Sequence, residues 1–155
     1  MKEKISFLLI STMLLSCATE PAKNSSATVQ NPMVGTWKLI TGTLIEKGDT
    51  TVTDYTKDKS FIKIINDDHF AFLQHGLGKS KDSAAEFSAG GGSYTLKDSA
   101  YTEFLEYCNA REWEGNHFDF TVHIRNDTLV QHGLEKIEGT DINRINIEKY
   151  ERLKK

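Results

Sequence analysis

From Val34 almost to the end of the chain, short segments rich in Val, Ile, Thr, Tyr and Phe alternate with clusters of polar turn residues. β-Branched and aromatic residues favour strands, whereas Gly, Asn and Asp favour the tight connections between them. The pattern therefore predicts an all-β domain with eight strands, over residues 35–46, 60–66, 69–75, 89–96, 100–108, 117–124, 128–134 and 142–153.

Most of the connections between these segments are short enough for hairpins, as at residues 47–49, 66–68, 97–99, 114–116 and 125–127. Strands that follow one another through short links predict an up-and-down antiparallel meander. Closing that meander into an eight-stranded barrel removes both open sheet edges. The longer polar connections, near 47–59 and 76–88, are expected at the barrel mouth.

Two segments also allow a helical interpretation. Residues 80–87 are the best helix candidate, although they are short and lack a clean apolar stripe. Residues 103–111 contain Glu and Leu, which favour a helix, but Tyr101, Thr102, Phe104 and Tyr107 favour a pleated surface. We therefore expect a continuous strand up to Cys108.

The amino terminus carries a different pattern, with charged residues first and a mostly apolar run over residues 5–15. That run is too short to span a bilayer but is typical of a signal peptide. Leu14-Leu15-Ser16-Cys17 resembles a bacterial lipobox, which implies cleavage before Cys17 and lipidation of its thiol. The alternative is an ordinary signal peptide with a chance cysteine. The next residue is Ala18 and not aspartate, which resembles the pattern of Gram-negative lipoproteins that are sorted to the outer membrane.

The sequence thus predicts a signal peptide over 1–16, a lipidated cysteine with a flexible linker over 17–33, and one barrel domain over 34–155. Residues 18–33 are small, polar and proline-bearing, as in disordered tethers. A net charge of −3 argues against a nucleic-acid partner. Once Cys17 is acylated, Cys108 has no partner for an intrachain disulfide. We expect a monomer held at the cell envelope by the lipid on Cys17.

Gly35-Thr36-Trp37 resembles the Gly-x-Trp signature of lipocalins. Three further segments stand at suitable distances, over residues 64–72, 90–103 and 148–153, and the whole resembles a lipocalin-like domain of small secreted bacterial proteins. The resemblance implies that Gly35 and Trp37 cap one end of the barrel and that Arg152 stacks on Trp37, although Arg152 is equally compatible with a solvated position. The lipocalin disulfide is absent, which leaves the ligand class open.

A barrel of eight strands is about wide enough for one small ligand, so the lumen is the expected site. We expect a small hydrophobic or amphipathic molecule there, because aromatic residues are dense on the predicted strands. An inward Glu103 needs a polar partner, which Lys63, His123 or Gln131 could supply. Glu106, three residues away, would face outward. The candidate ligand-binding residues are Phe72, Tyr94, Tyr101, Glu103, Phe104 and His123.

No catalytic motif is present, and the five histidines include no His-x-His pair, so we expect no catalytic residue, metal or cofactor. Two alternatives to a binding protein stay open. A structural module would have a packed lumen and bind proteins through residues 47–59 and 76–88. An enzyme would need Glu103 or Glu106 in contact with a histidine inside the lumen.

Overall fold

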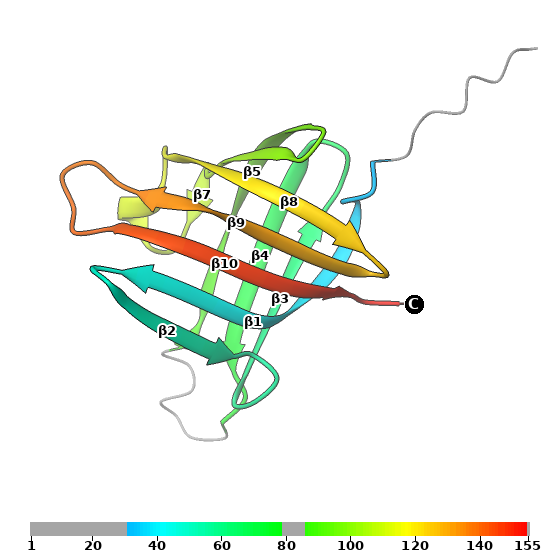
Figure 1. Ribbon diagram of the computed structural model, residues 1–155, viewed down its shortest axis with the longest axis horizontal. Coiled ribbons are helices and arrows are strands. Elements are labelled where there is room, and N and C mark those ends of the chain that lie inside the picture. The colour runs from blue at the N-terminus through cyan, green and yellow to red at the C-terminus, as the bar shows by residue number, and fades with distance from the viewer. Residues whose placement is uncertain (1–30, 79–85, 155) are drawn as a thin grey trace, which may run out of the picture.

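The computed structural model describes residues 31–78 and 86–154, and these form an antiparallel β-barrel (Figure 1). Eight strands close the barrel in chain order, with β10 paired to β1. The predicted fold class is confirmed. The barrel strands are β1 (Gly35–Glu46), β3 (Lys59–Ile65), β4 (His69–Gly76), β5 (Ser88–Lys97), β6 (Ala100–Phe104), β8 (His117–Arg125), β9 (Thr128–Lys136) and β10 (Asn143–Arg152).

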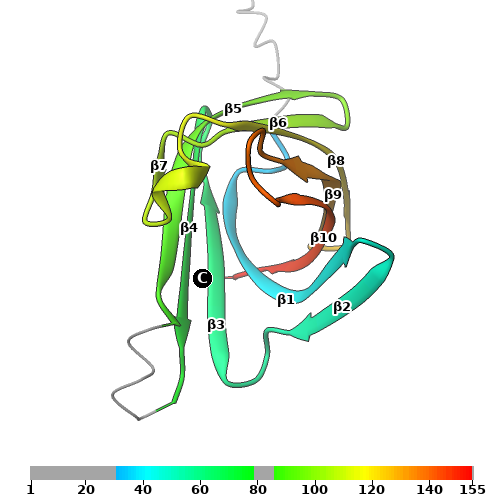
Figure 2. The same cartoon turned by 90° about the vertical axis from the view of Figure 1, so that its left-hand side faces the viewer.

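A strand that the sequence did not predict, β2 (Asp49–Asp54), lies outside the barrel. It folds back along the second half of β1 through a two-residue turn, in which Lys47 and Gly48 both have positive φ. The polar connection predicted over 47–59 thus contains a strand that pairs with β1. Because the first half of β1 pairs with β3 instead, β2 widens the wall only at the barrel mouth (Figure 2).

The predicted continuous strand over 100–108 is also wrong, because it divides into β6 and the short β7 (Tyr107–Cys108). Both strands pair with β5, and β7 does so at Gly90 and Gly91. A Cβ at Gly92 would collide with the backbone oxygen of Phe104, so the absent side chain lets the chain cross here. A 3₁₀ turn, η2 (Arg111–Trp113), follows β7 at the barrel mouth.

The other end of the barrel is closed by Trp37, which is fully buried. Its indole Nε1 donates to the carbonyl oxygen of Met33 at 2.7 Å. The Arg152 guanidinium lies 4.0 Å from the centre of the Trp37 ring and donates to the backbone oxygens of Val34 and Pro32. Gly35 has φ +145°, and a Cβ there would lie 2.5 Å from Arg152 Nη1. This is the arrangement that the sequence resemblance implied.

A bulge in β1 sets which side chains face the cavity above this closed end. The register with β10 shifts between Leu39 and Thr41. Trp37 and Leu39 face inward before the shift, and Gly42 and Leu44 line the cavity after it. An extra residue in one strand of an antiparallel pair re-aims the following side chains.

Several expectations fall outside the described residues. These are the signal peptide, Cys17, most of the tether and most of the possible helix over 80–87. Within the described residues, no helix has the length and apolar character needed to cross a membrane.

Candidate functional site

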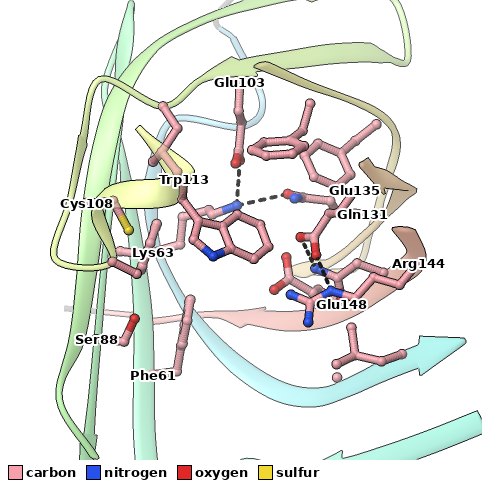
Figure 3. Close-up of a pocket in the computed structure, with 18 of the residues that line it drawn as sticks. Phe61, Lys63, Ser88, Glu103, Cys108, Trp113, Gln131, Glu135, Arg144 and Glu148 are labelled. Atoms are coloured by element: carbon pink, nitrogen blue, oxygen red, sulfur yellow. Dashed lines mark hydrogen bonds and ion pairs between the residues drawn. The ribbon is translucent and has the colours of Figure 1, made fainter. Parts of the chain in front are cut away.

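The half of the barrel nearer the mouth holds a cavity of about 310 Å³ (Figure 3). Its two walls differ in chemistry. Phe61, Ser88 and Cys108 lie on one side, whereas Glu135, Arg144 and Glu148 lie on the opposite side. Side chains therefore do not fill the lumen completely. A packed structural module would require a filled lumen.

The apolar wall is built from the aromatic rings of Phe61 on β3 and Phe72 on β4, with Tyr55 from the connection before β3. Phe61 stacks on Phe72 with ring centroids 5.7 Å apart, and Tyr55 meets Phe61 edge-on at 5.9 Å. Phe118 and Phe120 also line the cavity, but from β8, beside the strand that carries Gln131 and Glu135. Such offset and edge-on aromatic contacts are favourable beyond the area they bury, so this wall is a preformed surface for an apolar group.

The floor of the cavity is a buried ion pair. Lys63 Nζ lies 2.5 Å from Glu103 Oε1 and 3.1 Å from Gln131 Oε1, and all three side chains are buried. The Lys63 ammonium also lies between 5.5 and 5.9 Å from the ring centres of Phe70, Tyr101 and Tyr150. The carboxylate, the amide and the aromatic faces together compensate the ammonium group for the hydration that it loses on burial.

A second pair lies near the mouth. Glu135 accepts hydrogen bonds from Arg144 Nε and Asn146 Nδ2, both at 2.8 Å. The Arg144 guanidinium lies 5.1 Å from the centre of the Trp113 ring, which η2 places across the cavity entrance. Glu135 and Trp113 thus hold Arg144 from two sides.

Glu148 is the remaining carboxylate of the cavity. Its Oε2 accepts a hydrogen bond from the Tyr150 hydroxyl at 2.8 Å. Burial raises the pKa of Glu148 above its ordinary value, and the nearby charges of Glu135 and Glu103 act in the same direction, whereas Lys63 opposes them. The pKa of Tyr150 is raised by burial first and then by Glu148.

Two of the six predicted ligand-binding residues line this cavity, namely Phe72 and Glu103. The expected partner of Glu103 is supplied by Lys63, and Glu106 faces outward, where it accepts from Ser93. Tyr94 and Tyr101 are buried beside one another nearer the closed end, 5.3 Å between ring centroids, and do not line the cavity.

The predictions for Phe104 and His123 are wrong. Phe104 is 39% exposed and packs on His117 outside the barrel. His123 is exposed and stacks on His132 of the neighbouring strand. The reason is the two-residue period of a strand. Phe104 follows the inward Glu103, and His123 follows the inward Val122, so both must face outward.

The five histidines all belong to the described part of the chain, and all are exposed. The enzyme alternative needs a glutamate–histidine contact inside the lumen, and none of these histidines lies there. No group of three or more His, Cys, Asp or Glu side chains among residues 31–78 and 86–154 is arranged to hold a metal ion.

Sequence reasoning missed the polar wall. Arg144, Asn146 and Glu148 alternate along β10 in step with the buried Tyr150, and they line the cavity together. That alternation was a usable signal, because residues two apart on a strand share a face. Trp113 carried no comparable signal, since it reaches the entrance from a short turn.

Comparisons with family models, with curated proteins and with solved structures find no match to this chain.

Proposed function

We propose that the protein is a lipid-anchored envelope protein that holds one small amphipathic molecule in its barrel. The observation that carries the proposal is the two-sided cavity, with aromatic rings on one wall and charged groups on the other. A volume of about 310 Å³ suits a small ligand. A molecule with an apolar body and one polar end would satisfy both walls at once.

The ligand part is tested by native mass spectrometry on the full chain, extracted in detergent from the membranes of the cells that make it. We expect an additional mass that is lost on unfolding. Ala110 lines the cavity, so Ala110→Trp should displace the bound molecule. Ala100 is exposed on β6, so Ala100→Trp is the matched control and should keep it. A bare chain mass in all three proteins, with no uptake of a hydrophobic dye, would favour the structural module.

The anchoring part is supported by Leu14-Leu15-Ser16-Cys17 alone. The two cysteines of the chain allow a matched test in a Gram-negative host. Cys17→Ser should remove the diacylglycerol mass and release the protein from the membrane fraction, whereas Cys108→Ser should change neither. A Cys17→Ser protein that stays in the membrane fraction would contradict lipid anchoring through this residue.

A further inference from the structure

The charges of the cavity do not balance. Two cations, Lys63 and Arg144, and three carboxylates, Glu103, Glu135 and Glu148, line it. Lys63 pairs with Glu103, and Arg144 pairs with Glu135. Each cation is therefore already engaged, and the third carboxylate is left over.

Glu148 is that third carboxylate. Among the described residues it has one hydrogen-bond partner, the neutral Tyr150 hydroxyl, and no Lys, Arg or His nitrogen within ion-pair distance. Withdrawing a carboxylate from water without an ion-pair partner is costly, and burial raises the pKa of Glu148 although the charge of Lys63 opposes the rise. Burial raises the pKa of Tyr55, and the negative charge of Glu148 adds to that rise.

We propose that the ligand is an amphipathic cation, whose ammonium group pairs with Glu148 while its apolar body packs against Phe61 and Phe72. This inference rests on the proposed binding function and names the class of molecule bound. Figure 3 shows Glu148 and Phe61 at different sides of the same cavity, as a molecule with one charged end requires.

The opposite charge fits less well. An anionic ligand would enter a site that already has one surplus carboxylate, and both cations of that site, Lys63 and Arg144, are already paired with Glu103 and Glu135. A neutral ligand would leave Glu148 as it is. A primary ammonium supplies the missing positive charge and three hydrogen-bond donors.

The test uses three probes of similar shape: 2-phenylethylamine, propylbenzene and 3-phenylpropionate. Each is titrated into the full chain in detergent at neutral pH by calorimetry. We expect the amine to bind at least about tenfold more tightly than the carboxylate, because only the amine completes an ion pair. Glu148→Gln should weaken the amine about thirtyfold or more and leave propylbenzene unchanged.

Glu151→Gln is the matched control, since Glu151 lies on the exposed face of the same strand, and it should bind all three probes like the unchanged protein. Thermal melting of each variant shows that the fold is retained. Equal binding of the three probes, a preference for 3-phenylpropionate, or no loss in Glu148→Gln would each overturn the cationic ligand while leaving a binding barrel. No binding of any probe, with a bare mass in native mass spectrometry, would overturn both proposals.

Discussion

The closed end of the barrel and the cavity above it treat buried polar groups differently. At the closed end, the Trp37 nitrogen donates to Met33, and Arg152 donates to two backbone oxygens while covering the indole. In the cavity, Glu148 is left with one neutral donor beside two complete ion pairs. The polar groups that hold Trp37 in place are therefore paired within the fold, although the buried Tyr101 hydroxyl farther in has no partner. The cavity keeps one carboxylate that a bound ligand can pair with.

The largest effect is expected at the boundary between the two regions, where Lys63 meets Glu103. Glu103→Leu should lower the free energy of unfolding by about 3–5 kcal/mol, because it leaves a buried ammonium without its counter-charge. Adding Lys63→Met should restore most of the loss, since two apolar side chains replace the pair. Chemical denaturation of the two single variants and the double variant measures this. A double variant less stable than Glu103→Leu would show that the unpaired ammonium is not the main cause of the lost free energy of unfolding.

A smaller loss is expected at the closed end. Gly35→Ala places a Cβ against Arg152 at a backbone conformation that favours glycine, so it should cost about 1–3 kcal/mol. Gly139→Ala is the control, because φ is also positive there but open space surrounds the site. The melting temperature should fall more for Gly35→Ala than for Gly139→Ala. Amine binding should be unchanged in both, because neither residue lines the cavity.

The smallest effect on stability is expected at Glu148, and its sign is opposite. Because burial raises its folded-state pKa, the folded protein binds the proton more readily than the unfolded chain does. Stability therefore falls as pH rises from about 4.5 through the raised pKa, and stays lower above it. Glu148→Gln lacks this fall, so it should match the unchanged protein at pH 4 and be more stable at pH 8.

Melting curves of the two proteins across this pH range measure the difference. Glu103 and Glu135 face Glu148 from β6 and β9 in both proteins, so the difference between the two curves isolates the contribution of Glu148. Glu151→Gln, on the exposed face of the same strand, is the matched control. A Glu148→Gln protein that is less stable at pH 8 would mean that the carboxylate is compensated by a partner already present in the fold.

Part of the fold followed from local chemistry. The predicted first strand has the bounds of β1, and the other barrel strands agree within two residues except at the β6–β7 break. β2 was missed because Asp49–Asp54 is almost wholly exposed and carries no apolar residue that packs in the core. The break after Phe104 was missed because it depends on the close approach of Gly92, a residue on another strand.

The candidate site was predicted in fragments. The sequence offered Lys63, His123 or Gln131 as the partner of an inward Glu103. Lys63 donates to both Glu103 and Gln131, whereas His123 is exposed on the outside. The same two-residue period excludes Phe104 and His123 from the lumen and groups Arg144, Asn146 and Glu148 with Tyr150. On a strand, the face that a residue occupies decides whether its side chain can reach the lumen, whatever its chemistry.

By itself, the sequence determined that the chain forms short strands joined by tight turns, since strand propensity and turn chemistry act between near neighbours. It also determined which side chains of one strand share a face. Only the tertiary structure decided which charges meet, because Lys63 lies 40 positions from Glu103 and 68 from Gln131. Barrel closure and strand register bring these groups together, and the same closure leaves Glu148 in the cavity without a cation.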